Sequence, residues 1–181
     1  MKVRSLVIAV AAVLCLSACA MAADVALTPV GQSPDGMMVR VILKSLKLDA
    51  DYEALLKADD LKDQKALIAV VGASSKGMGA AGIDQEGELA RAEALCKAAA
   101  AKKMKVLVMH VGGTGRRGGS SNKFIETAGA YADGFIVVDG GNEDGFFDKL
   151  AEGRKVKLLT APNVKGTKEP LQTILKDWGL L

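Results

Sequence analysis

The chain has 181 residues, of which 50% are hydrophobic, 25% are charged and 4% are aromatic. This length suits one ordinary domain, and the composition excludes disordered, collagen-like and disulfide-scaffold chains. The 24 basic and 21 acidic residues give a formal charge of +3, which falls to +1 without Lys2 and Arg4, two residues that we expect to be removed. A charge so close to balance gives no drive for nucleic-acid binding through counterion release.

Residues 1–22 are predicted to be a signal peptide. Lys2 and Arg4 precede an unbroken apolar run at 6–16, and small residues follow to position 23, as in secretory signals. Two cleavage sites remain open. The Ala-Met-Ala sequence at 20–22 would release a soluble protein, whereas residues 16–19 resemble a bacterial lipobox, in which Cys19 is lipidated and becomes the mature N-terminus. An uncleaved membrane anchor is the third alternative, although the segment 6–23 is shorter than the roughly 20 residues of a spanning helix.

The cysteines favour neither a disulfide framework nor a metal site. Cys15 and Cys19 fall in the expected signal, which leaves Cys96 alone in the rest of the chain. Cys96 has the helical spacing of a core face that also includes Leu89 and Ala92, so we expect it to be a small buried residue.

The first predicted strand, at 25–30, is weak. It contains Pro29, which has no N–H to donate, and we therefore expect an edge strand or a short one. The sequence Ser33-Pro34-Asp35 then predicts the start of a helix, with a cap, a proline and an acid in the first turn. The expected buried face of this helix is Met38, Val41, Ile42, Ser45 and Leu46. The polar residues 49–65 predict a short surface helix.

Four stronger apolar runs, at 66–71, 105–109, 134–138 and 156–160, predict strands. Each run is almost continuously aliphatic, which is typical of parallel strands covered on both faces. Helical periodicity predicts helices at about 84–103, from 120 or 121 onward, from 142 to 153, and across 171–178 with Gly179 as the stop signal.

Strand, loop and helix alternate about five times, and this pattern predicts an α/β fold. We expect residues 23–181 to form a single doubly wound domain, Rossmann-like or flavodoxin-like, with a mostly parallel sheet of about five strands flanked by helices. Such folds bind ligands in the loops that follow the carboxyl ends of the strands. These are residues 31–36, 72–84, 110–122, 139–145 and 161–166, and the second and third of them hold nine of the 20 glycines.

The loop at 110–122 is the most informative segment of the sequence. Arg116 and Arg117 bring guanidinium groups suited to carboxylate or phosphate, and serines follow at a helix N-terminus, where backbone donors also favour an anion. The alternative is a solvated basic loop whose serines only cap the helix. The predicted ligand-binding residues are Ser33, Asp35, Ser74, Ser75, Lys76, His110, Arg116, Arg117, Ser120 and Asn142.

His110, the only histidine, is predicted at the end of a buried strand. It could serve as an acid or base, or it could be a structural residue that hydrogen-bonds a neighbouring loop. One histidine and one cysteine outside the signal make a zinc site unexpected. The acids Asp35, Asp84, Asp139 and Asp144 could hold a hard cation, but helix capping is the preferred interpretation, and we expect no metal.

No cofactor is expected either. Residues 72–79 resemble the nucleotide-binding loop of short-chain dehydrogenases, but four residues, not three, separate the first two glycines. The same glycines match the spacing of a P-loop, whose required Lys-Ser/Thr is replaced by Met78-Gly79.

Three peptides together resemble a known family. They are Gly31-Gln32-Ser33-Pro34-Asp35, Gly72-Ala73-Ser74-Ser75-Lys76-Gly77, and His110-Val111-Gly112-Gly113 followed by Arg116-Arg117-Gly118. With the expected signal they resemble a family of small exported bacterial proteins known only as a domain of unknown function. The resemblance covers the chain after the signal and implies a cell-envelope location and a Rossmann-like fold, but it carries over no catalytic residues.

The function that we expect is therefore binding of a small, carboxylate-like anion by an exported protein of the bacterial periplasm or cell envelope. A membrane transporter is the partner that this location suggests. We expect no nucleic-acid partner, and contact with a membrane only through a lipid on Cys19. Two alternatives remain: an enzyme that uses His110 as acid and base, and a protein–protein interaction module without a ligand.

Overall fold

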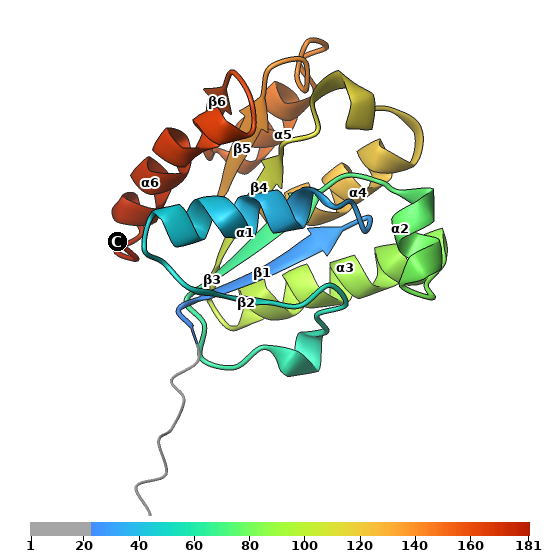
Figure 1. Cartoon of the computed structure of the whole chain (residues 1–181), viewed down its shortest axis with the longest axis horizontal. Coiled ribbons are helices and arrows are strands. Elements are labelled where there is room, and N and C mark those ends of the chain that lie inside the picture. The colour runs from blue at the N-terminus through green and yellow to red at the C-terminus, as the bar shows by residue number, and fades with distance from the viewer. Residues whose placement is uncertain (1–22) are drawn as a thin grey trace, which may run out of the picture.

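The computed structural model describes residues 23–181 (Figure 1). The expected signal, its cleavage sites and Cys19 lie outside these residues. Within the described part, one parallel sheet has the strand order β2-β1-β3-β4-β5-β6, so the predicted α/β doubly wound fold is confirmed with one strand more than expected. The strands are β1 (Val25–Val30), β2 (Ala50–Tyr52), β3 (Ala66–Val71), β4 (Lys105–His110), β5 (Gly134–Val138) and β6 (Lys157–Ala161).

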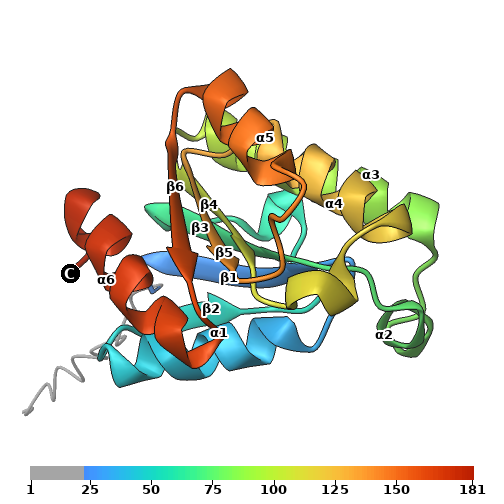
Figure 2. The ribbon, with the colours of Figure 1, turned by 90° about the horizontal axis from the view of Figure 1, so that it is seen from above.

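Helices cover both faces of the sheet, as Figures 1 and 2 show. Helices α1 (Asp35–Ser45) and α6 (Lys168–Asp177) lie on one face, and α3 (Gln85–Ala101), α4 (Gly119–Gly129) and α5 (Phe146–Arg154) lie on the other. The loops after β3 and β4 are not long open loops, because they contain the short helix α2 (Ser75–Ala80) and the 3-10 turn η2 (Gly113–Arg116). Two further 3-10 turns are η1 (Ala58–Asp60) and η3 (Lys165–Thr167).

The expectation that Pro29 marks an edge strand was wrong, because β1 lies inside the sheet between β2 and β3. Strand β2 pairs only with residues 25–27 of β1, so the backbone of Pro29 faces the side where β2 has already ended. A proline fits there because no neighbouring strand needs its missing N–H. Its carbonyl oxygen instead accepts a hydrogen bond from Arg91 Nη2 at 2.8 Å.

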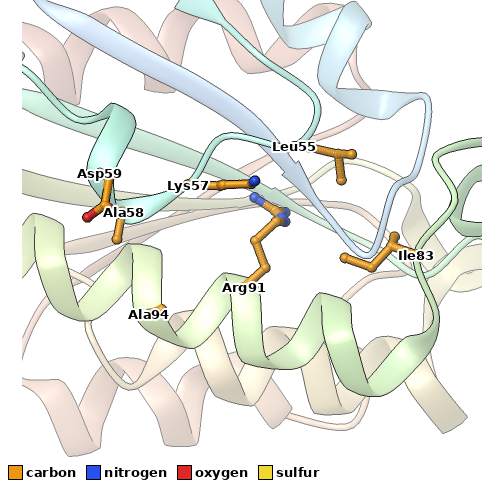
Figure 3. Close-up of a pocket in the computed structure, with 7 residues that line it drawn as sticks. All are labelled: Leu55, Lys57, Ala58, Asp59, Ile83, Arg91 and Ala94. Atoms are coloured by element: carbon orange, nitrogen blue, oxygen red, sulfur yellow. The ribbon is translucent and has the colours of Figure 1, made fainter.

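Residues 49–65 do not form the expected surface helix. They contain the edge strand β2 and the turn η1, which together place residues 55–59 over helix α3 (Figure 3). A strand of three residues gives too short an apolar pattern to be recognised in the sequence.

The buried face of α1 also differs from the prediction. Val39, Ile42 and Leu43 pack into the core, whereas Met38 and Val41 are 47% and 65% exposed. The helix carries two apolar stripes at helical spacing, and periodicity alone does not say which of them faces the sheet.

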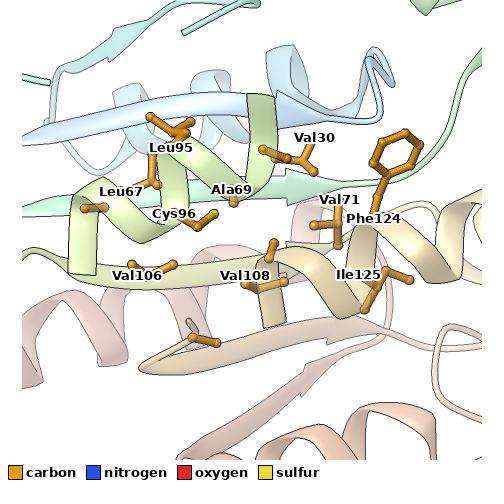
Figure 4. Packing of buried hydrophobic residues seen from close by; sticks show 14 of the residues in the cluster. Val30, Leu67, Ala69, Val71, Leu95, Cys96, Val106, Val108, Phe124 and Ile125 are labelled. Carbon is orange, nitrogen blue, oxygen red and sulfur yellow. The ribbon is translucent and has the colours of Figure 1, made fainter. Parts of the chain in front are cut away.

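The larger core cluster fills the space between the sheet and helices α3, α4 and α5 (Figure 4). Alternate residues of the central strands, such as Ala69, Val71 and Val108, point into it and meet Leu95 of α3 and Phe124 of α4. Cys96 is fully buried there, as predicted. A second cluster lies under α1 and α6, so apolar side chains cover both faces of the sheet. This accounts for the continuous aliphatic runs of its strands.

Candidate functional site

The strand order produces a crevice at the carboxyl ends of β1 and β3. From β1 the chain turns to α1 and then to β2 on one side, whereas from β3 it turns to the opposite face and continues to β4 on the other side. The chain therefore leaves β1 and β3 toward opposite faces of the sheet, and ligands of doubly wound folds bind where strand order reverses in this way. Figure 1 shows α2 at this end of the sheet.

A pocket of about 340 Å³ lies at this crevice. Its polar lining comes from both loops and from the end of β2, and its apolar lining comes from two prolines and an alanine. The lining residues are Pro29, Gln32, Ser33, Pro34, Tyr52, Ser74, Lys76, Gly77 and Ala80. Three of the ten predicted ligand-binding residues, Ser33, Ser74 and Lys76, thus come together in one pocket.

The β1 loop, residues 31–34, is held from beneath by helix α3. The amide of Gly31 donates to Oε1 of Glu88 at 2.8 Å, and Nε2 of Gln32 donates to the same oxygen at 3.1 Å. Gln32 has a positive φ of 58° and also donates to the carbonyl of Ala54. Glu88 is fully buried and pairs with Arg91, whose Nε lies 2.7 Å from Oε2 of Glu88.

The β3 loop, residues 72–74, is held by the neighbouring loop and by helix α4. The amide of Ser74 donates to the carbonyl of Gly31 at 2.8 Å, and the amide of Ala73 donates to Oγ of Ser121 at 3.0 Å. Ser74 caps α2, because its Oγ accepts from the amide of Gly77. Gly77 is required at its position because a Cβ there would overlap the carbonyl oxygen of Gln32.

Two hydroxyl groups in the pocket can donate a hydrogen bond to a ligand. Oγ of Ser33 accepts from the amide of Asp35, and Oγ of Ser74 accepts from Gly77, but neither hydroxyl donates to any residue that the structure describes. Tyr52 adds a third hydroxyl, and burial raises its pKa above the ordinary value, so it remains a donor at neutral pH. These three groups are hydrogen-bond donors for a ligand oxygen.

Lys76 is the cation of the pocket. It is exposed on the first turn of α2, and among residues 23–181 no carboxylate lies within ion-pair distance of its amine. The neighbouring Ser75 is exposed as well but does not line the pocket.

Arg116 does not reach the pocket. Its Nε lies 3.0 Å from Oδ2 of Asp35, an ion pair without the alignment of a hydrogen bond, and its Nη1 donates to the carbonyl of Ala73. Its side chain packs on Gly112, where a Cβ would come within 2.6 Å of the arginine Cβ. Arg116 and Asp35, two predicted ligand-binding residues, thus link the loops after β4, β3 and β1.

Arg117 is likewise bound internally. It forms a two-pronged ion pair with Asp144, at 3.0 and 3.2 Å, and also donates to the carbonyl of Gly141. Its guanidinium lies over the ring of Phe146, 4.7 Å from the centroid. The hydrogen bond from Arg117 holds the pKa of Asp144 below its ordinary value. The two adjacent arginines therefore point to different loops and do not form one anion clamp.

His110 is completely buried at the end of β4. Its Nδ1 lies 3.1 Å from the carbonyl of Val71, and its Nε2 lies 3.0 Å from the carbonyl of Gly113. Burial lowers the pKa of His110 below its ordinary value, so the ring is neutral at pH 7 and donates to one of the two carbonyls. In this position the imidazole connects two loops and is not exposed to a substrate.

The two remaining predicted residues also have internal partners. Oγ of Ser120 donates to the side chain of Gln85, and Nδ2 of Asn142 donates to Asp148 at 2.9 Å. Oδ1 of Asn142 accepts from the amide of Phe147 at 2.7 Å, so this residue orders the start of α5.

Sequence reasoning missed Gln32, Tyr52, Glu88 and Arg91. The last two carry a visible signal, since a glutamate and an arginine three residues apart face the same side of a predicted helix. That pattern usually indicates an exposed pair, and nothing in the sequence shows that a loop passes over it.

The described residues contain no group of three or more His, Cys, Asp or Glu side chains arranged to hold a metal ion. Over the same residues, no helix is both long enough and apolar enough to cross a membrane.

Comparison with known proteins gives one decisive match. The model of a family described as a domain of unknown function, DUF6305, matches residues 22–175. The chain belongs to this family. The curated proteins contain no match to this DUF6305 chain.

Solved structures similar to this DUF6305 chain include an esterase, AlinE4, described as a member of the SGNH-hydrolase family, and a mutant of the same esterase. Each is 12% identical, covers 84% of this chain and 92% of its own, and has a TM-score of 0.31. A similarity of this degree carries no argument about function.

Proposed function

We propose that this DUF6305 protein binds a small molecule with a single carboxylate in the pocket between the β1 and β3 loops. The observation that carries the proposal is the position of Lys76, a cation without an acidic partner among the described residues, beside three hydroxyl donors at the point where strand order reverses.

Arg116 and Arg117 are both paired with acids, and this restricts the class of anion that the pocket would bind. With Arg116 paired to Asp35 and Arg117 paired to Asp144, the residues that line the pocket include one cation, Lys76, and no arginine. The guanidinium of Arg40 lies over the ring of Tyr52, 5.4 Å from its centroid, and Arg40 is not a lining residue. A phosphate dianion is usually recognised by several cations or by an arginine fork, whereas one ammonium with hydroxyl donors matches a monocarboxylate. The two prolines, Ala80 and the ring of Tyr52 would contact the apolar part of the ligand.

The test compares carboxylates with their uncharged amides. Lactate and benzoate, each beside its amide, are titrated into the protein while backbone amide signals are followed by NMR. We expect the acids, and not the amides, to shift the signals of Ser33, Ser74 and Gly77. Lys76→Gln should abolish these shifts, whereas Lys123→Gln, at an exposed position of α4, should leave them unchanged. Equal shifts in Lys76→Gln, or none with either acid in the unaltered protein, would refute the proposal.

We further propose that the protein works in the bacterial cell envelope and passes its ligand to a membrane transporter. Support comes from the signal-like sequence of residues 1–22. Cell fractionation and metabolic labelling with palmitate test this part. Label on the protein that disappears in Cys19→Ala identifies the lipobox, label-free periplasmic protein identifies cleavage near residue 22, and cytoplasmic protein refutes export.

A further inference from the structure

A second pocket lies on the other side of the β1 loop, between the segment 55–59 and helix α3 (Figure 3). Its volume is about 360 Å³, within the range of roughly 300–1,000 Å³ that small-molecule sites occupy. The pocket shares no lining residue with the one at the switch point. Its lining residues are Leu55, Lys57, Ala58, Asp59, Ile83, Arg91 and Ala94.

The pocket has an apolar wall and a cationic end. Leu55 and Ile83 lie to one side of Arg91 and face the pocket, and Ala94 contributes a methyl group from α3. Figure 3 shows the amine of Lys57 directed toward the guanidinium of Arg91. The carboxylate of Asp59 is directed away from both cations in the same view.

The charge at the cationic end is incompletely balanced. Arg91 is held by Glu88 and by the carbonyls of Pro29 and Leu56, which leaves one N–H of Nη1 without an acceptor among the described residues. Glu88 accounts for the charge of Arg91, but no carboxylate of residues 23–181 lies within ion-pair distance of Lys57. Lys57 is exposed, and the carboxylate of Asp60 accepts from its backbone amide at 2.9 Å, so the groups at this end that an anion can bind are the ammonium of Lys57 and one N–H of Arg91.

We propose that this pocket binds a carboxylate with a hydrocarbon tail. The carboxylate accepts from Lys57 and from the free N–H of Arg91, and the tail lies against Leu55, Ile83 and Ala94. The proposal stands apart from the proposed function, because it concerns a different pocket and a different cation.

Isothermal titration of the full chain with octanoate and with octan-1-ol tests this site, since the two probes share a tail and differ in charge. Octanoate should bind, and Lys57→Gln should weaken it about tenfold, the usual effect of losing one hydrogen bond to a charged group. The weaker binding of octanol should not change in this variant. The titrations are made in the Lys76→Gln background, which removes the carboxylate site proposed at the switch point. In that background Lys62→Gln, at an exposed lysine further along the chain, should leave octanoate binding unaltered.

A second variant tests the location of the tail. Ala94→Trp fills the pocket from an exposed position of α3 and should abolish binding of both probes, while circular dichroism shows a folded chain. The proposal is overturned if octanoate does not bind, if Lys57→Gln binds it as tightly as the unaltered protein does, or if folded Ala94→Trp still binds it.

Discussion

The backbone amide of Gly31 donates to the buried carboxylate of Glu88 at 2.8 Å, so a helix on one face of the sheet fixes the loop that turns toward the other face. Arg91 completes this arrangement by bonding both Glu88 and the carbonyl of Pro29. The side chains of the two charged residues are 0% and 7% exposed, which makes them the most deeply buried ion pair in the described chain.

Glu88→Gln should destabilise the protein by about 3–5 kcal/mol, because removing one member of a buried pair leaves the other charge without compensation. Urea unfolding at pH 7 measures the loss. Asp177→Asn is the matched control: it breaks the ion pair with Lys157, whose side chains are 67% and 44% exposed, and should cost less than about 1 kcal/mol. Similar losses in the two variants would contradict the role assigned to Glu88.

Two glycines of α2 should respond in opposite ways to alanine. A Cβ at Gly77 overlaps the backbone carbonyl of Gln32, whereas a Cβ at Gly79 meets nothing within 4 Å. Gly77→Ala should lower stability by about 1–3 kcal/mol and displace the β1 loop. Gly79→Ala should raise stability by about 0.5–1 kcal/mol, since alanine is the better helix former. Thermal unfolding of the two variants distinguishes them, and a stabilised Gly77→Ala would mean that the loops do not approach as described.

The buried His110 should make the protein less stable in weak acid. Burial lowers the pKa of His110 in the folded protein below the ordinary 6.5. As the pH falls through 6.5 the unfolded chain takes up a proton first, so the free energy of unfolding decreases until the folded pKa is passed. Above 6.5 the contribution is fully present.

Denaturant titrations of the unaltered protein and of His110→Gln, at intervals between pH 8 and pH 5, measure this effect. The stability advantage of the unaltered protein over the variant should shrink as the pH falls. An advantage that stays constant would show that folding leaves the pKa of His110 unchanged, and one that grows toward pH 5 would show that the folded protein favours the charged ring; either result contradicts the prediction.

Cys96 should be chemically inert in the folded protein. Burial raises the pKa of its thiol to about 12, and its side chain has no exposed surface. Because the thiolate is the reactive form, iodoacetamide at pH 8 should leave Cys96 unmodified in the native protein and alkylate it fully in urea. Peptide mass spectrometry reads this position separately from Cys15 and Cys19. Alkylation of the native protein at the rate seen in urea would contradict the described packing.

The sequence predicted the layers of the fold well, because each central strand is an aliphatic run whose residues pack on both sides. The predictions were wrong where tertiary packing overrides a local sequence preference. Pro29 suggested an edge strand, yet its backbone lies beyond the short β2, and Met38 and Val41 had the spacing of a core face that Val39 and Leu43 occupy instead.

The site was harder to predict than the fold. The cluster of arginines was visible in the sequence, but the acids that neutralise it come from other loops, Asp35 after β1 and Asp144 after β5. Only the folded chain shows which cations already have partners. Lys76 was identified from its loop alone, whereas Tyr52 belongs to a strand that the sequence did not predict.

Because α3 supports the β1 loop, the ligand specificity of the switch-point pocket can change without a change in its backbone. The frame of the switch-point pocket is built from backbone groups and from the side chains of Gln32, Glu88 and Ser121. The side chains of Lys76 and Tyr52 form no hydrogen bond in that frame, so their polar groups can be changed without breaking it, although the ring of Tyr52 also packs against the core under α1. Relatives with other ligands, and laboratory variants selected for new ones, should therefore differ first at these two positions.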